Sequence, residues 1–398
     1  MTTSNRPQPL SGIRVLDISQ VMAGPFCCML LGDMGADVIK IEPPKVGDST
    51  RHSMGFRLKG EDSPGFLALN RNKRSIALDL KNPADREVLY ALVKTADVLV
   101  ENARPGVAER LGMGYDTLSE INPRLIYASI SGFGHTGPWS QRPGFDLIAQ
   151  AMSGVLSATG LPGSEPVKNG IPVGDLGAGL FAAYGILSAI IGREKTGLGQ
   201  FIDASLLEAA LGLSVWETTE LWGTGQSPQP IGSANRMSAP YQAVQGSDGW
   251  FVIGAANQKL WLTFLEVIGR SELNSDPRFS SNALRVANRV ALIELLKPTF
   301  ATRTVHEWVE ALLAAGVPAG PIYNYQQALA SDHVAARDMV IDIPHPIEGS
   351  FRALGFPVKM HGTPQQVRHP PPLLNEHADE IRRELIEKGL LNDVKATP

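Results

Sequence analysis

The sequence predicts an α/β protein with a parallel-sheet core and a smaller α+β unit. Three observations predict this class. Short β-rich runs alternate with helical segments through the first half of the chain, a stretch rich in Gly, Pro, Ser and Gln interrupts it at residues 224–237, and a hairpin pattern follows. With 398 residues and 43% hydrophobic content, the chain is long enough for one large or two ordinary domains.

The first alternating unit covers residues 13–42. Residues 13–18 are a short β-rich run, residues 24–34 form an apolar helical segment, and residues 36–42 are a second strand stopped by a Pro-Pro pair. Strand, helix and strand over about thirty residues is typical of a βαβ unit. Ligands of such units bind beyond the carboxyl ends of the strands, so we expect loop 19–25 to line a ligand site.

A cluster of cations precedes the next predicted strand, residues 76–80. Residues 70–75 read Asn-Arg-Asn-Lys-Arg-Ser. A basic cluster that leads into a strand could bind phosphates, and a solvated charged loop fits the same pattern equally well.

The later elements are predicted in the same way, from apolar residues that recur at helical spacing or at strand spacing. Helices are predicted at residues 82–95, 116–121, 206–221, 260–268, 283–300, 305–315 and 378–388, strands at 97–100, 125–130 and 200–204, and a hairpin at 241–244 and 250–253. The chain from residue 316 to the last of these helices is expected to be irregular.

Residues 132–137 match the dinucleotide fingerprint Gly-x-Gly-x-x-Gly after a predicted strand. That motif must open a helix, but here Pro and polar residues follow, and the next helix is expected to begin only near Asp146. The motif also follows the fourth strand and not the first. We therefore do not expect a nicotinamide cofactor.

Asp175 stands among glycines, in the stretch Ile-Pro-Val-Gly-Asp-Leu-Gly-Ala-Gly that opens an uncharged segment expected to be a wholly buried helix. One interpretation makes it the N-cap of that helix. The other makes it a nucleophile, which the helix dipole keeps ionised and which Gly174, Gly177 and Gly179 leave uncovered for a substrate. Both can hold together.

Composition narrows the function classes. The chain has 36 basic and 40 acidic residues without a basic run, which argues against nucleic acid. Adjacent Cys27 and Cys28 cannot build a disulfide framework, so we expect a cytoplasmic protein, and the eight histidines lack metal-ligand spacing. Residues 1–10 are polar and unlike a secretory signal, and the uncharged stretch 176–192 is too short and too rich in glycine to predict a membrane span.

The chain resembles the class III CoA-transferases, the group of the formyl-CoA and carnitine CoA-transferases. The residues that carry the resemblance are spread over the chain from about Leu10 to the last helix. They are the turn at 20–25, the strand at 36–42, Asn-Lys-Arg-Ser at 72–75, Glu-Asn-Ala-Arg-Pro-Gly at 101–106, Lys-Thr-Gly-Leu-Gly-Gln at 195–200 and Gly-Val-Pro-Ala-Gly-Pro at 316–321.

The resemblance implies a fold, a nucleophile and a set of CoA contacts. The implied fold has a large Rossmann-like domain, residues 1–223 and 323–398, and a small α+β domain, residues 224–322, in an interlocked ring homodimer. The family's nucleophilic aspartate falls on Asp175. The implied CoA contacts are Gln20, Val21, Ala23, Leu78, Lys81, Asn102 and Arg110; from charge alone we add Arg71 and Arg104 as candidates for the ADP phosphates.

Two departures from related patterns bear on the substrate. Formyl-CoA transferases carry a run of glycines where this chain has residues 233–238 without one, which argues against formate or oxalate. Related acyl-CoA racemases use a histidine in Gly-His-Asp, where this chain has Gly144-Phe145-Asp146; a phenylalanine cannot move a proton, so racemisation is the minor alternative.

The resemblance thus predicts transfer of CoA from an acyl-CoA, with no tightly bound cofactor and no metal. The overall likeness points to members that use succinyl-CoA and a dicarboxylic acid such as glutarate, for which Arg236 is a weak candidate in the acceptor pocket. Asp175 is expected to pass through an acyl anhydride and an aspartyl-CoA thioester, with oxyanions held by N–H groups near the glycines. A CoA-binding protein without turnover is the rival from another class.

Overall fold

The computed structural model describes residues 6–53 and 56–392 and divides the chain into two compact units. The larger unit comprises Met1–Leu156, Lys168–Gln226 and Ala335–Pro398, and the smaller unit comprises Ser157–Val167 and Ser227–Val334. The expected domains, 1–223 with 323–398 and 224–322, stay a prediction, because a compact unit within one chain is not yet a domain that folds by itself.

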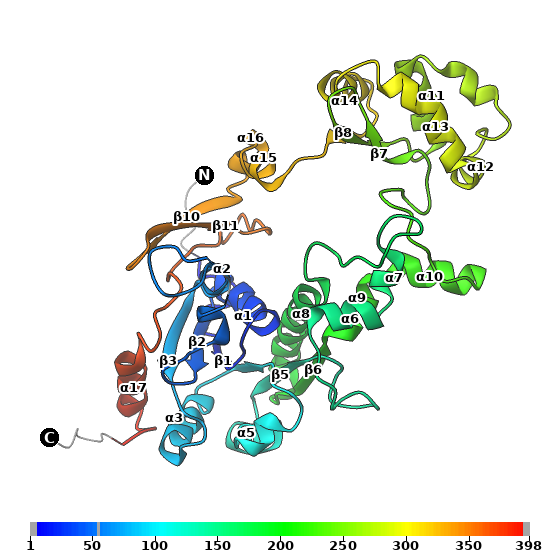
Figure 1. The fold of residues 1–398 in the computed structure, drawn as a ribbon. Coiled ribbons are helices and arrows are strands. Elements are labelled where there is room, and N and C mark those ends of the chain that lie inside the picture. Colours follow the sequence, from blue (N-terminus) through cyan, green and yellow to red (C-terminus); the bar gives the residue numbers. More distant parts are fainter. Residues whose placement is uncertain (1–5, 54–55, 393–398) are drawn as a thin grey trace. The chain divides into compact units, whose positions relative to one another are not determined.

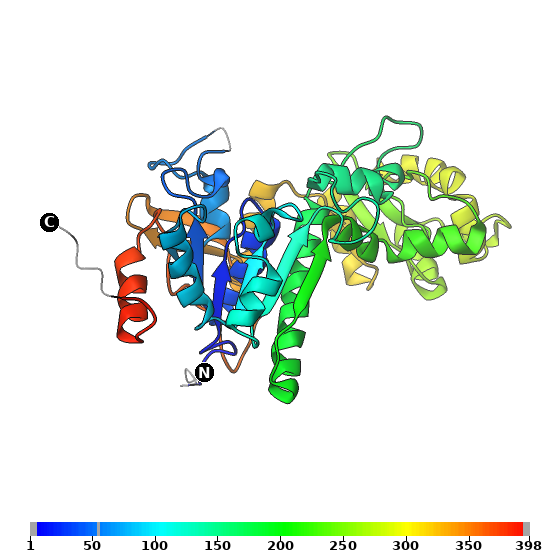
Figure 2. The same cartoon turned by 90° about the horizontal axis from the view of Figure 1, so that it is seen from below.

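The larger unit is built on a six-stranded parallel sheet with the strand order β3-β2-β1-β4-β5-β6. Its strands are β1 (Arg14–Asp17), β2 (Asp37–Glu42), β3 (Lys73–Ala77), β4 (Val98–Glu101), β5 (Ile126–Ser131) and β6 (Phe201–Ser205). Their arrows all point toward one edge of the sheet (Figure 2). The predicted parallel α/β core is therefore confirmed.

Helices cover both faces of this sheet (Figure 1). On one face lie α1 (Ala23–Asp33), α6 (Asp146–Met152), α8 (Val173–Thr196) and α9 (Leu206–Leu213), and on the other lie α3 (Pro83–Val93), α4 (Val107–Arg110), α5 (Tyr115–Ile121) and α17 (Ala378–Glu387). The larger unit also contains η1 (Ser49–Arg51), α2 (Pro64–Leu69) and α10 (Val215–Thr224). Alternate strand residues such as Val15 and Leu16 pack toward α1 with α8 on one face and toward α3, α5 and α17 on the other. Because both faces are buried, the strands read as continuous apolar runs.

The smaller unit combines a three-stranded antiparallel sheet with helices. Its elements are β7 (Tyr241–Gln245), β8 (Trp250–Gly254), β9 (Ala319–Pro321), α11 (Gln258–Ile268), η2 (Ser271–Ser275), α12 (Asn282–Ala287), α13 (Arg289–Phe300), α14 (Val305–Ala314) and α15 (Tyr325–Leu329), while α7 (Val155–Ala158) and α16 (Asp332–Ala336) lie across the unit bounds. The predicted hairpin is confirmed. The sequence did not reveal β9, nor a second hairpin in the larger unit, β10 (Val340–His345) with β11 (Gly349–Leu354).

The basic cluster at residues 70–75 is neither a phosphate loop nor a solvated loop. Strand β3 begins three residues earlier than expected, so the cluster itself enters the sheet. Lys73 Nζ lies 2.8 Å from the Asp17 carboxylate, and both side chains are fully buried. Buried charges require partners, and this cluster finds them inside the unit.

Helix α8 is not wholly buried, contrary to our expectation. It is long and apolar enough to cross a membrane by length and composition alone, but Ala178, Ala182, Ile186 and Ala189 lie in the core against the sheet and α1. A stripe on its other side is exposed, including Tyr184 with 71% of its surface accessible. Alanine and glycine on the buried side of α8 let neighbouring elements approach closely, whereas large apolar side chains occupy its exposed side.

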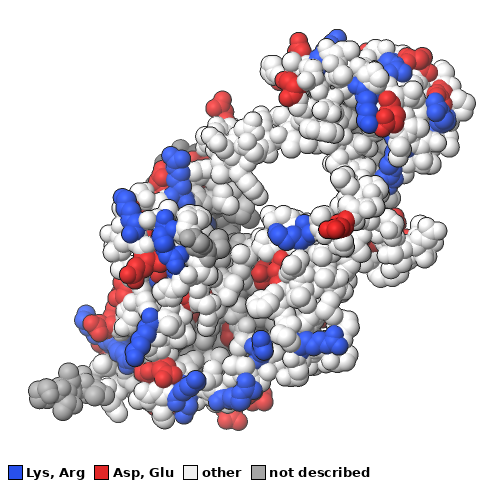
Figure 3. Space-filling model, viewed as in Figure 1, with Lys and Arg blue, Asp and Glu red and all other residues white. Residues whose placement is uncertain are grey.

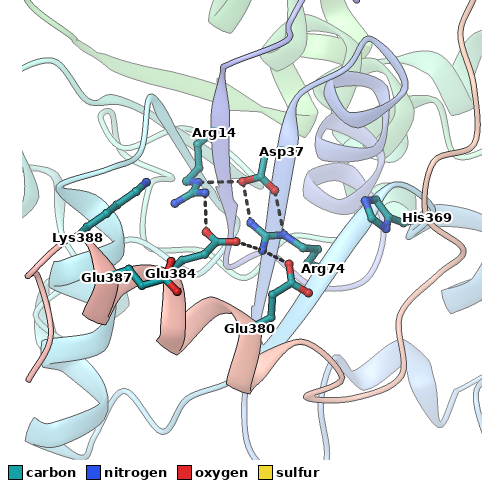
Figure 4. Close-up of a pocket in the computed structure, with 8 residues that line it drawn as sticks. All are labelled: Arg14, Asp37, Arg74, His369, Glu380, Glu384, Glu387 and Lys388. Atoms are coloured by element: carbon teal, nitrogen blue, oxygen red, sulfur yellow. Dashed lines mark hydrogen bonds and ion pairs between the residues drawn. The ribbon is translucent and has the colours of Figure 1, made fainter. Parts of the chain in front are cut away.

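A network of ion pairs attaches helix α17 to the amino ends of the strands (Figure 4). Arg14, at the start of β1, bonds Asp37 at 2.9 Å and Glu384 at 2.8 Å. Arg74 bonds Asp37, Glu380 and Glu384 at 2.6–2.8 Å. These side chains line a pocket of about 460 Å³ at the edge opposite the predicted ligand site. The two guanidinium groups are already paired, so the pocket serves the attachment of α17.

Replacing Glu384 by Gln is expected to weaken this attachment by about 1–2 kcal/mol, because charged hydrogen bonds at a partly exposed site are lost. Hydrogen exchange of the α17 amides measures the change. Glu387→Gln is the control, since Glu387 lines the same pocket without an ion pair to a described residue. Equal protection of the α17 amides in the two variants would contradict the role of Glu384 in attaching α17.

The same network sets a pH dependence. Burial acts to raise the pKa of Asp37 and of Glu384, but hydrogen bonds from Arg74 and the charges of Arg74 and Arg14 hold both below their usual range. A carboxylate with a depressed pKa stabilises the folded state above its unfolded pKa of about 4 and loses that contribution as the pH falls. Protection of α17 should therefore decline below that pH in the parent protein.

Candidate active site at the carboxyl edge of the sheet

The strand order reverses between β1 and β4, so the connections that leave these strands run to opposite sides. A crevice at such a reversal is the usual ligand site of an open parallel sheet. Two predicted contacts meet here: the Gln20 backbone N–H donates to Asn102 Oδ1 at 2.8 Å, and Asn102 Nδ2 donates to the Gln20 carbonyl at 2.7 Å. The loops after β1 and β4 are thus joined across the reversal, with the Val21 side chain 45% exposed.

The other predicted contacts follow carboxyl ends of strands but differ in exposure. Lys81, Arg104 and Arg110 are exposed and form no ion pair with a described residue. Ala23 and Leu78 are 3% and 2% exposed, so a ligand would meet their backbone and not their side chains. The three free cations after β3 and β4 suit the phosphates of a nucleotide.

Two candidate arginines already have partners. Arg71 is buried, its guanidinium bonds Asp33 at 2.7 and 2.9 Å, and its Nη1 donates to the Leu354 carbonyl at 2.7 Å. These contacts give Arg71 a packing role in place of the phosphate contact that we expected. Arg236 is half-buried in the smaller unit, where Nη2 donates to the Gln229 carbonyl at 2.8 Å.

Asp175 is the third residue of α8 and not its N-cap, which is Pro172. The N-cap interpretation is therefore wrong. The Asp175 side chain is half-buried, and its carboxylate accepts no hydrogen bond from any residue within 6–53 and 56–392. A carboxylate that is neither sealed in the core nor engaged by the protein is available to react.

The first turn of α8 is capped from outside by Asp146, at the start of α6. Asp146 Oδ1 accepts the backbone N–H of Gly174 at 2.8 Å and of Asp175 at 3.3 Å, and its Oδ2 accepts from Gln150 Nε2 at 2.6 Å. The N–H groups nearest the glycines are thus occupied, which corrects our expectation that they hold oxyanions. The sequence showed Asp146 as the start of a helix and as the residue after Phe145 in a racemase-like position, but not as a cap of α8.

The glycines around Asp175 serve helix packing. A Cβ on Gly174 would meet Asp146 at 3.0 Å, one on Gly177 would meet Leu213 at 3.0 Å, and one on Gly179 would meet the Ala23 carbonyl at 2.7 Å. They allow α6, α9 and α1 to approach α8, and the expected role in leaving the carboxylate uncovered stays a prediction. Gly179 lies one turn after Asp175, so Asp175 is on the side of α8 that contacts the start of α1.

The electrostatic setting of Asp175 also differs from our expectation. Burial, followed by the charge of Asp146, raises the pKa of Asp175 to about 6. The helix dipole would act in the other direction, but Asp146 occupies the N–H groups through which that dipole acts most strongly. Perturbed carboxyl groups at a ligand edge are typical of functional sites.

A second buried carboxyl group at this edge was missed by sequence reasoning. Glu101 ends β4 with 2% exposure, and burial raises its pKa to about 7, although Ser129 and the Ala103 N–H bond it. The hydroxyl of Ser129, its neighbour on β5, also lies 2.6 Å from His135 Nε2. Only the register of two strands joins these residues, which no local pattern shows.

We predicted that the Gly-x-Gly-x-x-Gly stretch does not open a helix, and the structure confirms this. It belongs to a loop that ends where α6 begins, at Asp146. Within this loop Gly132 packs against Gly144, since a Cβ on Gly132 would lie 2.9 Å from the Gly144 Cα. Gly132 therefore serves a backbone contact, whereas Gly134 and Gly137 adopt the positive φ that favours glycine.

Residues 10–378 match CoA-transferase family III. A human succinyl-CoA:glutarate CoA-transferase is 38% identical, and the alignment covers 96% of this chain and 87% of that protein. An acetyl-CoA:oxalate CoA-transferase from Acetobacter aceti is 41% identical over 96% and 97% of the two chains. The crystal structure of a CAIB/BAIF family protein from Brucella suis superposes with a TM-score of 0.84 at 38% identity, covering 96% of this chain and all of the other.

The raised pKa of Asp175 can be measured directly. In protein labelled with ¹³C-aspartate, the Asp175 carboxyl resonance, identified by its absence from Asp175→Asn, should titrate near pH 6. Asp146→Asn removes a neighbouring negative charge and should lower that midpoint. A midpoint near 4 in the parent protein, the usual aspartate value, would contradict the description of this site.

Proposed function

The chain belongs to CoA-transferase family III, and from that premise we propose that Asp175 is the nucleophile that carries CoA between two acids. Family membership makes the chain a CoA-transferase that acts on acyl-CoA thioesters and carboxylic acids. The observation that carries the proposal for Asp175 is its half-buried carboxylate, which accepts no hydrogen bond from a described residue and lies one helical turn before Gly179, where α8 contacts the start of α1.

In the first half-reaction, the Asp175 carboxylate attacks the thioester carbonyl of the donor. The carbon–sulfur bond breaks, CoA leaves as a thiolate with the electron pair, and an anhydride joins the acyl group to Asp175. The thiolate then attacks the aspartyl carbonyl, and the donor acid leaves as a carboxylate. The aspartyl-CoA thioester that remains keeps the energy of the original thioester bond.

The second half-reaction repeats these steps in reverse. The acceptor carboxylate attacks the aspartyl thioester and displaces the thiolate, which attacks the acceptor carbonyl of the new anhydride and frees Asp175. Water must be excluded while the anhydride exists, because hydrolysis would waste the thioester. The partial burial of Asp175 in the first turn of α8 supports this requirement.

The proposed CoA site follows the carboxyl edge from β3 to β4. Gln20, Val21, Ala23, Leu78, Lys81, Asn102 and Arg110 remain the proposed contacts. Arg104 is exposed beside Asn102 and is the proposed partner of the ADP phosphates. Arg236 stays a weak proposal for the acceptor pocket.

For the substrates we propose succinyl-CoA and a dicarboxylate such as glutarate. Relatives named for that pair, from human, mouse and Agrobacterium fabrum, are 34–38% identical to this chain. Relatives named for oxalate are 36–41% identical, so the missing glycine run does not separate this chain from oxalate-using proteins.

Racemisation remains the minor alternative on structural grounds as well. Phe145 is 72% exposed and cannot accept a proton, and the carboxylate of Asp146 is held by three N–H donors. Neither residue supplies a second free base beside Asp175.

We also propose a homodimer, and the exposed apolar residues of α8 and α10 support it. Tyr184 and Ile191 on α8, and Trp216 and Trp222 on α10, are between 59% and 78% exposed. The charged side chains of the larger unit are intermixed in sign on the face in view (Figure 3). Large apolar side chains that gather on an exposed face of a folded unit are typical of a protein interface, and these four support one on α8 and α10.

The proposed nucleophile can be tested by turnover and mass. Asp175→Ala should reduce transferase turnover at least about 10³-fold, because no covalent intermediate can form, whereas CoA affinity should stay. Intact mass spectrometry of the parent protein with donor acyl-CoA should show CoA attached to the chain. The control Glu194→Gln, an exposed acidic residue at the other end of α8, should keep the adduct.

The same assay separates the classes and the substrates. Unchanged turnover in Asp175→Ala would reject Asp175 as the nucleophile. A protein that binds CoA but never forms an adduct or a new thioester would be a CoA-binding protein without turnover. The panel should include succinyl-CoA with glutarate and with oxalate. Transfer from another donor alone would reject the proposed pair and leave the family activity intact.

The proposed dimer can be tested by light scattering after size-exclusion chromatography. The parent protein should have twice the mass of one chain, and Tyr184→Glu should shift the protein toward monomer because a charge cannot be buried unpaired at an apolar interface. Val290→Glu, at an equally exposed apolar position on α13, is the control. A monomeric parent protein would reject the dimer.

A further inference from the structure

The loop Ser19–Val21, which joins β1 to α1 at the strand reversal, is held by side chains from other parts of the chain. The Ser19 N–H donates to Asp17 Oδ1 at 3.0 Å, and the Ser19 carbonyl accepts from Lys40 Nζ at 2.9 Å. Both backbone groups of Gln20 are bonded to the Asn102 side chain. Lys40 and Asn102 thus fix three backbone groups of this loop from distant positions in the sequence, and the loop borders the proposed CoA site.

Val21 adopts an unusual backbone conformation in this loop. Its φ is +68°, and it is the sole β-branched residue among the five non-glycine residues with positive φ in the described part of the chain. Such residues rarely enter the left-handed region, because the side chain crowds the backbone. An outlier of this kind at a ligand edge points to a constraint imposed by the surroundings.

The constraint comes from Asp48. Its Oδ1 accepts the Val21 N–H at 3.2 Å and also the backbone N–H and hydroxyl of Thr50, at 2.9 and 2.8 Å. Its Oδ2 lies 3.0 Å from Lys40 Nζ, and both side chains are fully buried. Asp48 thus holds the Val21 backbone through a hydrogen bond. Lys40 in turn binds both the Asp48 carboxylate and the Ser19 carbonyl.

We propose that Asp48 is a positioning residue of the CoA site: its carboxylate holds Val21 in the left-handed conformation that shapes the Ser19–Val21 loop for acyl-CoA. The inference rests on the proposed function of this edge. Asp48 is buried under the loop and does not meet the ligand. Its loss lets Val21 return to negative φ, which displaces the Gln20 backbone and weakens acyl-CoA binding more than the reaction at Asp175.

A matched pair of double variants isolates the hydrogen bond to Val21. Lys40→Met with Asp48→Asn and Lys40→Met with Asp48→Ala both remove the buried ion pair, so neither leaves a lone buried charge between these two residues. Asparagine keeps an oxygen that can accept the Val21 N–H, and alanine does not. The alanine variant should show a KM for acyl-CoA at least tenfold above that of the asparagine variant, with kcat within threefold.

A third variant tests the strain itself. Adding Val21→Gly to the alanine variant should lower the KM again, because glycine enters the left-handed region without a steric cost. A general loss of folding would not be repaired by a glycine. Circular dichroism melting of each variant, together with titration of CoA by calorimetry, reports whether the fold and the affinity change together.

Equal KM values in the two double variants, or no recovery with Val21→Gly, would overturn the role of Asp48. If the alanine variant does not fold, Lys40→Met with Asp48→Leu takes its place, because leucine is similar in shape to asparagine but has no acceptor for the Val21 N–H, and the same comparison of KM values decides. Failure of the proposed function has a different signature, since the parent protein would then neither bind CoA nor transfer it.

Discussion

The reversal of strand order between β1 and β4 is the constraint on which the rest of the site depends. Chain segments leave the two central strands toward opposite sides of the sheet, so no connection covers the edge between them. The Gln20–Asn102 pair closes this gap with two hydrogen bonds of 2.7–2.8 Å. The approach of α8 to α1 at Gly179 sets the position of α8, whose first turn carries Asp175.

Buried charges rather than apolar contacts fix the details at both ends of the sheet. Lys73 and Asp17 pair beneath the carboxyl edge, and Arg74 and Asp37 pair at the amino edge. Such pairs contribute little net stability, since desolvation offsets their attraction. Their geometry is specific, however, and removal of one member would leave an unpaired buried charge. They therefore determine where loops and helices lie more than how stable the unit is.

Local patterns predicted most strands and helices of the sheet, because apolar runs, Pro-Pro stops and glycine turns act within a few residues. Asp175 was identified through its glycine context and the family resemblance together. Local patterns gave a wrong prediction where the interaction partners are distant in sequence. The cations at residues 71–74 were expected in an exposed loop because their partners Asp17, Asp33 and Asp37 are far away in the sequence. Asp146 was missed as a cap for the same reason, since 28 residues separate it from Gly174.

The position of Asp146 resolves a conflict in the chemistry expected of Asp175. A carboxylate in the first turn of a helix should be weakly basic, because the dipole stabilises its charge. A nucleophile benefits from the opposite property, since nucleophilicity rises with basicity. Burial, followed by the charge of Asp146, raises the pKa of Asp175 to about 6, and Asp146 also accepts the Gly174 and Asp175 N–H groups of that turn. At pH 7 such a group is still about nine-tenths ionised, so the site combines a more basic carboxylate with a largely intact supply of the reactive form.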